Sequence, residues 1–339
     1  MNTVKNKILK HTSPLATFIL GLCLLTGFWS CQHETDPPDG PNLVERFGPF
    51  EVLDSLTLDR TNVDFSAEEN VAFSARFNKN IEWVITITGT QSGAVKTIEG
   101  FDRNVNSENA VWNGTTTILP FFRDELCTVE LTVPEEPDYV DSAEVEVIGT
   151  RVYEGLLVTD WEDGVNPGFN EFTQSGANMR FDTVVSPTSV QGNVFYEMSG
   201  EVTFADDLGN VLMPKGTFTD GNETLSPNGD VVFFNVFARR GPSSVNDIFV
   251  IQFMEDDDEN GSYNSNADDL HEFVFQDLSL DWEQFSIRYS NLTTTNSAGG
   301  GEKNPDKLVQ MVILPIGLGE PFEGYLDYLI FTEGGPLQP

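Results

Sequence analysis

VVFFNVFARR, residues 231–240, has the pattern of a β-strand with one buried face. The even-numbered positions from 232 to 238 are all apolar, whereas the odd-numbered positions carry Asn235 and Arg239 beside two phenylalanines. Side chains alternate between the two faces of a strand, so this pattern places a continuous apolar face against a core. It indicates a β-rich fold.

The rest of the chain repeats this pattern, because short β-branched and aromatic runs recur between Gly, Asn, Asp and Pro, with almost no helical periodicity. In the first half we expect strands at Val71–Phe77, Ile81–Thr88, Ala94–Ile98, Thr115–Pro120, Cys127–Val133 and Ala143–Ile148. In the second half we expect them at Val194–Met198, Val231–Arg239, Ile248–Glu255, Glu272–Phe275, Phe285–Tyr289, Leu308–Leu314 and Gly324–Phe331. The pattern predicts an all-β protein, with an immunoglobulin-like sandwich over residues 47–150 and a larger β-jelly roll over residues 151–339.

Two tryptophans of the first block have alternative interpretations. Trp83 lies on a predicted central strand, where we expect it to pack in the core. Trp112 precedes Asn113-Gly114, so it either packs at an edge turn or presents its ring to a sugar.

The first thirty residues have the features of a signal peptide, with basic residues Lys5, Lys7 and Lys10 before a short apolar run that ends at Ser30. Cys31 stands where a lipoprotein signal peptidase would cut, and an acylated cysteine would anchor the chain to a membrane. Residues 31–46 are acidic and Pro-rich, which predicts an extended tether. An ordinary secretory peptide is the alternative.

The net charge excludes nucleic acid as a partner. It is −36, and setting aside the three lysines of residues 1–30 makes it −39. Phosphate binding needs basic surface, which this chain lacks. With Cys23 in the signal peptide and Cys31 acylated, only Cys127 remains, so no disulfide is expected within the chain.

Polar side chains interrupt four predicted strands on the face opposite their apolar set. They are Asn235 and Arg239, with Phe237 beside them, and Gln252, Arg288 and Gln310. Amide and guanidinium groups suit sugar hydroxyls and an aromatic ring suits a pyranose face, so these six residues are candidates for a glycan-binding surface. A solvated outer sheet would show the same pattern.

Three segments of the second block resemble family 11 and other galactose-binding-like carbohydrate-binding modules. They are Thr159–Gly164 (TDWEDG), Leu280–Ile287 (LDWEQFSI), and Asp306–Gln310 followed by Tyr325–Phe331 (YLDYLIF). With Cys31 and its acidic tether, the chain resembles the surface glycan-binding lipoproteins of Bacteroidota-type starch-utilisation systems. The resemblance implies the outer membrane as location, facing the outside, a polysaccharide ligand with β-glucan favoured, and a neighbouring outer-membrane transporter as partner.

The same resemblance implies a structural Ca²⁺ between the first and last strands of the module, at positions matching Glu162 and Asp327. Their carboxylates are the hard oxygen ligands that Ca²⁺ prefers. A second candidate is the loop with Asp256, Asp258 and Asn260, which matches D-x-D-x-[DN]-G but has Ala267 at the twelfth position. Exposed turn acids would look the same at either place.

The leading hypothesis is therefore a non-catalytic protein that captures a polysaccharide at the cell surface for delivery to an uptake system. A structural or adhesive envelope lipoprotein that binds a protein is the alternative. A glycoside hydrolase is a third, because acidic residues are plentiful. Outside the signal peptide only His33 and His271 remain, so a histidine-dependent active site would rest on His271.

Overall fold

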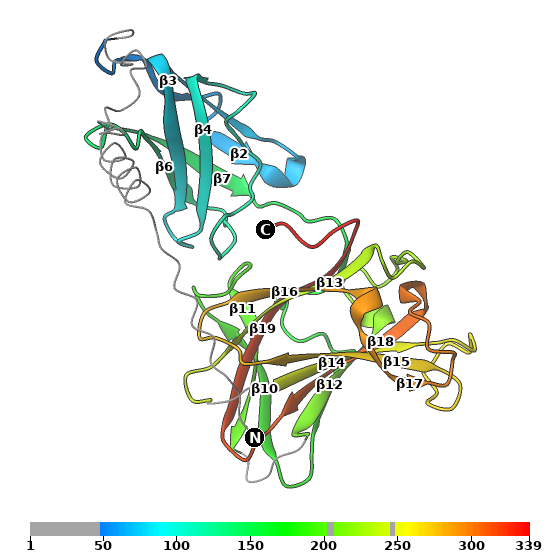
Figure 1. Cartoon of the computed structure of the whole chain (residues 1–339). Coiled ribbons are helices and arrows are strands. Elements are labelled where there is room, and N and C mark those ends of the chain that lie inside the picture. Colours follow the sequence, from blue (N-terminus) through cyan, green and yellow to red (C-terminus); the bar gives the residue numbers. More distant parts are fainter. Residues whose placement is uncertain (1–47, 202–206, 245–247) are drawn as a thin grey trace, which may run out of the picture. The chain divides into compact units, whose positions relative to one another are not determined.

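The computed structural model describes residues 48–201, 207–244 and 248–339, and Glu51–Pro339 forms one compact unit (Figure 1). The predicted signal peptide, Cys31 and the tether lie outside the described residues. Within the described part of the chain, no helix is long and apolar enough to cross a membrane.

The N-terminal half is a seven-stranded sheet whose order is β1-β3-β6-β7-β2, with β4 and β5 also paired to β3. Its strands are β1 (Val52–Leu58), β2 (Asn62–Asp64), β3 (Val71–Gly89), β4 (Val95–Val105), β5 (Val111–Trp112), β6 (Leu126–Thr132) and β7 (Val140–Gly149). The two runs predicted at Val71–Phe77 and Ile81–Thr88 are one 19-residue strand, β3. Every odd-numbered residue of β3 is buried, which gives the strand one continuous apolar face apart from Lys79.

Both tryptophans of this half belong to its interior. Trp83 on β3 and Trp112 on β5 are fully buried. Trp112 lies edge-on between Phe65 and Phe122, at 4.7 Å from each ring, and donates its indole N–H to the Thr115 carbonyl at 3.0 Å. Trp112 is therefore a packing residue, and the interpretation as a sugar platform is wrong.

The predicted strand Thr115–Pro120 does not form. The segment has bends and one isolated bridge between Val95 and Ile118. Thr116 lies at its centre with its hydroxyl against the carbonyls of Val95 (2.9 Å) and Ile118 (2.6 Å). A threonine that bonds nearby backbone in this way competes with a regular strand ladder.

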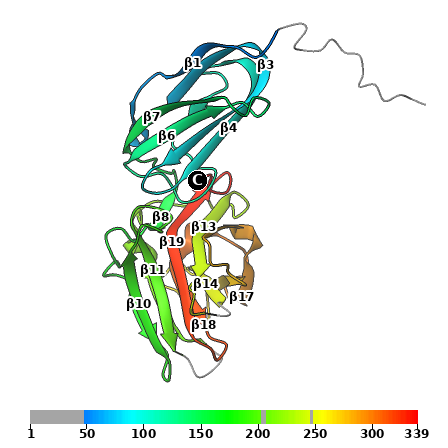
Figure 2. The ribbon, with the colours of Figure 1, turned by 90° about the vertical axis from the view of Figure 1, so that its left-hand side faces the viewer.

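The C-terminal half consists of two six-stranded sheets packed face to face. The first, here called the β13 sheet, has the order β10-β11-β19-β13-β16, with β8 also on β19; the second, the β14 sheet, has the order β17-β15-β14-β18-β12-β9. The strands are β8 (Leu156–Thr159), β9 (Asn170–Thr173), β10 (Asn178–Val185), β11 (Val194–Glu201), β12 (Gly209–Pro214), β13 (Val232–Arg240), β14 (Ile248–Glu255), β15 (Asp269–Gln276), β16 (Glu283–Arg288), β17 (Thr293–Ser297), β18 (Leu308–Ile316) and β19 (Phe322–Glu333). Figure 2 shows β10, β11, β19 and β13 side by side, with β14, β17 and β18 behind them.

The core between these sheets follows the alternation of the sequence. Phe234 and Val236 of β13 face Phe249, Ile251 and Phe253 of β14 across it. The prediction of an all-β chain with a larger C-terminal sandwich of the jelly-roll type is confirmed. The immunoglobulin-like assignment of residues 47–150 stays a prediction.

Candidate functional site

The six residues predicted to bind glycan lie on the two opposite outer faces of the C-terminal sandwich. Asn235, Phe237, Arg239 and Arg288 lie on the outer face of the β13 sheet, whereas Gln252 and Gln310 lie on the outer face of the β14 sheet. They do not form one surface, because the core of the sandwich separates the two groups. The predicted single glycan-binding face is therefore wrong as a set.

Asn235 is fully buried and holds the C-terminal tail. Its amide donates to the Ile330 carbonyl (3.3 Å) and to Thr332 Oγ1 (2.9 Å). Its Oδ1 accepts hydrogen bonds from Ser286 Oγ (2.7 Å) and from the backbone N–H of Leu337 (2.9 Å). With its partners already in the protein, Asn235 has a structural role and is not accessible to a glycan.

Phe237 is also fully buried. Its ring packs edge-on against Phe121 with centroids 5.3 Å apart, and Phe121 in turn contacts Tyr328 at 5.6 Å. Because Phe121 and the tail residue Leu337 belong to the same apolar cluster, the middle of this outer face is covered. Phe237 thus cannot present its ring to a sugar.

Arg239 lies among three aromatic rings, and we call this group the Arg239 cluster: Arg239, Phe195, Trp282 and Tyr325. The guanidinium carbon is 5.4 Å from the centroid of Phe195, 4.9 Å from Trp282 and 4.7 Å from Tyr325. Phe195 and Tyr325 are buried, whereas Trp282 is half-buried. A hydrogen bond from the indole Nε1 to the Thr188 carbonyl (2.6 Å) fixes the ring of Trp282 in place.

The guanidinium of Arg239 forms no ion pair with any residue in the described part of the chain. Its hydrogen bond goes to Thr188 Oγ1 at 3.4 Å, and its Nε has no partner. Partial burial lowers the pKa of Arg239, although the nearby Glu323 acts in the opposite direction. Burial opposes ionisation of Glu323, but hydrogen bonds from the Tyr325 hydroxyl and the Ser243 N–H lower its pKa. The Arg239 cluster, with Glu323 beside it, therefore places a cation, a carboxylate and an aromatic plane together, although the partnerless Nε of Arg239 is itself buried.

Arg288 lies apart from this cluster. It is exposed on β16 and its guanidinium rests 5.3 Å from the centroid of Phe233, its neighbour on β13. Phe233 and Arg239 are six residues apart on one strand, which corresponds to about 20 Å. Arg288 and the Arg239 cluster therefore cannot contact the same sugar ring.

Gln252 and Gln310 lie close together on the outer face of the β14 sheet. Gln252 is paired with Glu272 on one side and Val312 on the other. Gln310 follows two positions away on β18, with its amide 2.9 Å from the sulfur of Met254. This face therefore presents side-chain amides among half-buried aliphatic residues.

The two predicted calcium ligands do approach each other. Asp327 is fully buried and its Oδ2 accepts the backbone N–H groups of Val190 (2.7 Å) and Gln191 (3.2 Å). Glu162 Oε1 accepts those of Asn193 and Val194, both at 2.8 Å. One short loop, Ser186–Asn193, thus connects the two carboxylates.

This place also contains buried oxygens without partners. Asp327 Oδ1 and Gln191 Oε1 are both inaccessible to solvent and accept no hydrogen bond of normal geometry. Burial raises the pKa of Asp327 well above its usual range, and the charge of Glu162 adds to the effect; burial likewise raises the pKa of Glu162. A Cβ on Gly192 would lie 2.3 Å from the Glu162 carboxyl carbon, so the loop needs glycine to approach this closely. Orphaned hard oxygens of this kind fit Ca²⁺.

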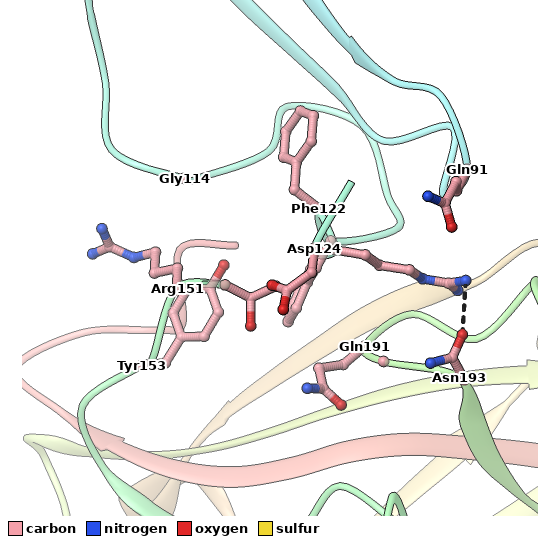
Figure 3. A pocket seen from close by; sticks show the side chains of 12 residues that line it. Gln91, Gly114, Phe122, Asp124, Arg151, Tyr153, Gln191 and Asn193 are labelled. Carbon is pink, nitrogen blue, oxygen red and sulfur yellow. Dashed lines mark hydrogen bonds between the residues drawn. The ribbon is translucent and has the colours of Figure 1, made fainter. Parts of the chain in front are cut away.

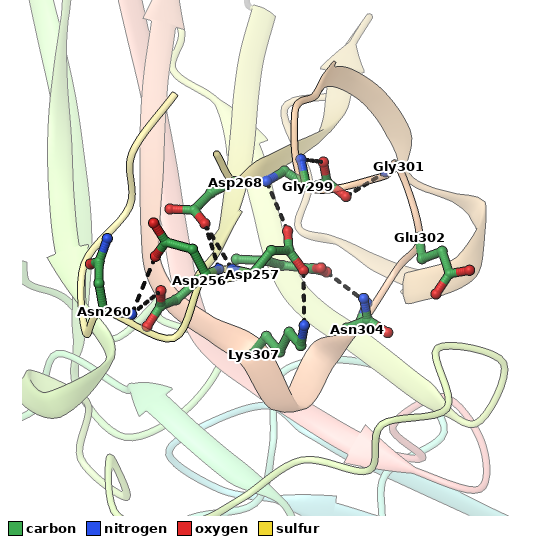
Figure 4. A network of polar contacts seen from close by, with 12 residues as sticks. Asp256, Asp257, Asn260, Asp268, Gly299, Gly301, Glu302, Asn304 and Lys307 are labelled. Atoms are coloured by element: carbon green, nitrogen blue, oxygen red, sulfur yellow. Dashed lines mark hydrogen bonds and ion pairs between the residues drawn. The ribbon is translucent and has the colours of Figure 1, made fainter. Parts of the chain in front are cut away.

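The second predicted metal site is a compact acidic loop (Figure 4). Carboxylate oxygens of Asp256, Asp258 and Asp268 lie within 4.8 Å of one another, so the third carboxylate of the group comes from position 268, directly after Ala267. Asn260 does not join them, because its Oδ1 accepts the N–H and the hydroxyl of Ser262. The oxygens of Asp256 and Asp268 accept backbone N–H groups of the loop, which accounts for their arrangement without a cation.

The sequence did not indicate a cavity of about 270 Å³ beside the Ser186–Asn193 loop (Figure 3). Arg151 and Tyr153 lie on one side of it, and Gln191 and Asn193 on the other. Arg123 at its wall is already engaged, since it donates to Asn193 Oδ1 (3.2 Å) and Ser189 Oγ (3.1 Å). Among the described residues that line the cavity, one hydrogen bond joins two side chains, the bond from Arg123 to Asn193.

His271, the residue on which a histidine-dependent active site would rest, is fully buried. Its Nδ1 contacts Thr294 Oγ1 at 3.1 Å and its Nε2 contacts the Glu302 carbonyl at 3.1 Å. A general base must reach a substrate, and this imidazole does not reach the surface.

Sequence comparison with known proteins does not assign the chain to a family. No family model matches the chain, and no curated protein matches it. Among solved structures, it is similar to a family 11 carbohydrate-binding module from Clostridium thermocellum in complex with a β-1,3-1,4-mixed-linked tetrasaccharide, with 12% identity over 55% of this chain and 100% of the other and a TM-score of 0.39.

A structure titled for the promiscuous specificity of carbohydrate-binding modules of the β-sandwich superfamily shows 13% identity over 84% of this chain and 98% of the other, with a TM-score of 0.38. The family 30 module of a Clostridium thermocellum cellulosomal cellulase shows 10% identity over 53% and 98%, with a TM-score of 0.37. Similarity at this level establishes neither a common family nor a common ligand.

Proposed function

We propose that the C-terminal sandwich binds a polysaccharide without catalysis, and that the Arg239 cluster contacts it. The observation that carries the proposal is the Arg239 guanidinium, which lies against three aromatic rings beside the half-buried indole of Trp282 and has no ion-pair partner among the described residues. A structural arginine of this burial usually has a carboxylate partner, because a charge taken out of water needs compensation.

The chemistry of the cluster matches that of a sugar ring. The C–H face of a pyranose packs on an aromatic plane, and the free N–H groups of a guanidinium donate to adjacent hydroxyls. Glu323 supplies an acceptor for a further hydroxyl. The net charge of −36 disfavours a polyanionic glycan, so we propose a neutral one, with a β-glucan as first choice.

We further propose that Ca²⁺ is held by Asp327, Glu162 and Gln191 as a structural ion. Support comes from the partnerless buried oxygens of Asp327 and Gln191 and from the short loop that binds both carboxylates. A divalent cation would neutralise two carboxylates whose burial is otherwise unfavourable.

The sequence before residue 47 supports a location for this activity. We propose that Cys31 is acylated in the outer membrane and that the sandwich faces outward, next to an outer-membrane glycan transporter. Metabolic labelling with a radioactive fatty acid would test the anchor: the label should enter the wild-type chain and be absent from Cys31→Ser.

Affinity electrophoresis of the full chain against a panel of neutral and acidic polysaccharides, with Ca²⁺ present, tests the binding function. We expect one neutral glycan to retard the wild type and Trp282→Ala to lose most of that retardation. Gln252→Ala is the matched control, because Gln252 lies on the opposite sheet and should leave retardation unchanged.

The binding proposal fails if no glycan retards the folded protein. If Gln252→Ala loses binding and Trp282→Ala keeps it, the glycan binds the β14 sheet and the assignment to the Arg239 cluster is wrong. Release of reducing ends from the bound polysaccharide would instead favour a hydrolase.

A protein partner is the second candidate, and the β14 sheet favours it. Its outer face exposes Phe172 on β9 by 52% and Val274 on β15 by 43%, and the strands between them carry half-buried aliphatic residues. Exposed apolar side chains on a sheet face are a feature of protein contacts.

A further inference from the structure

Behind the acidic loop lies a second group of potential metal ligands, which no glycan or calcium assignment uses. Glu255 on β14 and Asp269 and His271 on β15 are each fully buried, and their ligand atoms lie within 4.8 Å of one another. Unlike the acidic loop, this group contains an imidazole and has no exposed member.

The charge of this group is not balanced. Within the described residues, the carboxylates of this group form one ion pair, between Glu255 Oε1 and His271 Nε2 at 3.3 Å. Two lysines lie nearby without an ion pair to this group: Lys303 Nζ donates to Thr294 Oγ1 at 3.2 Å, and Lys307 Nζ pairs with Asp257 at 3.2 Å (Figure 4). Two buried carboxylates with one protonated histidine keep a net charge of −1, whereas two carboxylates with a neutral histidine and a divalent cation are neutral.

Two buried polar atoms at the group face each other. Glu255 Oε2 and the Tyr289 hydroxyl belong to fully buried side chains and have no further partner in the described part of the chain. Burial raises the pKa of Tyr289, and the charge of Glu255 and a hydrogen bond between the two groups add to the effect. A neutral hydroxyl beside Glu255 leaves the buried carboxylate charge uncompensated, and a cation at the group would neutralise it.

Oxygen atoms converge on one nitrogen of His271. Its Nε2 is 3.1 Å from the Glu302 carbonyl and 3.3 Å from Glu255 Oε1. Its Nδ1 is 3.1 Å from Thr294 Oγ1, which can accept the imidazole proton. In that tautomer the Nε2 lone pair points at two oxygens, where a cation would bridge them; in the other tautomer the Nε2 proton is donated to one of these oxygens.

A glycine-rich loop fixes the carboxylates around this place. The N–H groups of Gly299 and Gly301 donate to the two oxygens of Asp269 at 2.7 and 2.6 Å, and the N–H of Asn304 donates to Glu255 at 2.8 Å (Figure 4). Ligands that are themselves hydrogen-bonded in fixed orientations are a feature of metal sites.

We infer that Glu255, Asp269 and His271 form a buried site for a divalent transition-metal ion, with Zn²⁺ as the ion that fits best. One imidazole and two carboxylates are a ligand set that Zn²⁺ accepts at four-coordinate sites, and the Glu302 carbonyl is placed to serve as a fourth ligand. A nitrogen ligand distinguishes this site from the all-oxygen place at Asp327, which suits Ca²⁺.

The test uses the full chain carrying His11→Gln and His33→Gln, so that His271 is the only histidine. The protein is stripped with a chelator, saturated with Ca²⁺ to fill oxygen sites, labelled with ¹⁵N-histidine and titrated with Zn²⁺. We expect uptake of one equivalent of Zn²⁺, a shift of the His271 Nε2 resonance, and a higher Tm.

His271→Gln should abolish this uptake, whereas Asp258→Asn, in the exposed acidic loop nearby, should keep it. An unchanged Nε2 resonance at saturating Zn²⁺ in the folded protein overturns the proposal, and so does an uptake that His271→Gln leaves intact. If the His271→Gln variant does not fold, the response of the His271 Nε2 resonance to Zn²⁺ in the parent protein, which carries His11→Gln and His33→Gln, still tests the proposal.

Discussion

Asp327 should make the calcium-free protein lose stability as the pH rises. Burial raises the pKa of this carboxyl well above its usual range, so the folded protein holds the proton to a higher pH than the unfolded chain does. Its stabilising contribution is fully present below the unfolded pKa, near 4, and is lost as the pH rises through the folded pKa. We expect the proposed Ca²⁺ ion to reverse this pH dependence of stability, because it would bind the ionised carboxylate.

The size of this effect follows from the number of protons involved. Within the window between the two pKa values the folded state holds one more proton than the unfolded state. The free energy of unfolding then falls by about 1.4 kcal/mol for each pH unit. Exposed carboxylates such as Asp182, whose pKa is lowered mainly by its hydrogen bond with Arg180, act in the opposite direction. The comparison must therefore be made against a variant that lacks only the Asp327 charge.

Urea unfolding of the chelated wild type and of Asp327→Asn at several pH values between 4 and 7 measures the difference. We expect the wild type to lose stability relative to Asp327→Asn as the pH rises, and Ca²⁺ to stabilise the wild type most at pH 7. Parallel pH profiles for the two proteins would refute the assignment of a buried, proton-binding carboxyl at Asp327.

Two further predictions concern packing. Gly100→Ala should destabilise the N-terminal half by about 1–3 kcal/mol, because its Cβ would lie 2.2 Å from the Trp83 ring. The control is Gly216→Ala, whose Cβ would meet no atom within 4 Å. Equal melting temperatures for the two variants would contradict the reasoning. Asn235→Ala should cost about 1–3 kcal/mol in urea unfolding by leaving the Leu337 N–H unpaired, yet keep glycan retardation, and lost retardation in a folded variant would reopen Asn235 as a ligand residue.

Strand positions and faces could be predicted from the sequence because they depend on local alternation. The even-numbered residues from 232 to 238 do enter the core, as the pattern predicted. Alternation cannot say whether an outward polar residue meets solvent or another part of the chain. Asn235 and Arg239 share a face of β13, but residues about 100 positions away cover Asn235 and leave Arg239 near the surface.

Alternation also cannot say which faces of different strands belong together. Gln252 and Arg239 each lie on the face of their strand that is opposite its apolar side chains. Their strands belong to different sheets of the sandwich, so the outer faces of these two sheets point in opposite directions. The one signal for the Arg239 cluster was Trp282 in a polar context, Asp281-Trp282-Glu283. The missing information was the antiparallel pairing of β11, β19 and β13, which brings Phe195 and Tyr325 beside Arg239.

The Ser186–Asn193 loop connects the proposed calcium ion to the proposed glycan surface. Its backbone donates to Asp327 and Glu162, while its Thr188 accepts the Trp282 indole N–H at 2.6 Å and an Arg239 N–H at 3.4 Å. Without the ion, and once the pH is high enough to ionise Asp327, repulsion between the two carboxylates acts on the loop that positions the indole. We therefore expect chelation to weaken glycan retardation of the wild type at pH 7, and to weaken it less in Asp327→Asn, where one of the two charges is absent. Equal retardation with and without chelator in the folded wild type would show that the loop keeps its position without the ion, and that the two sites act independently.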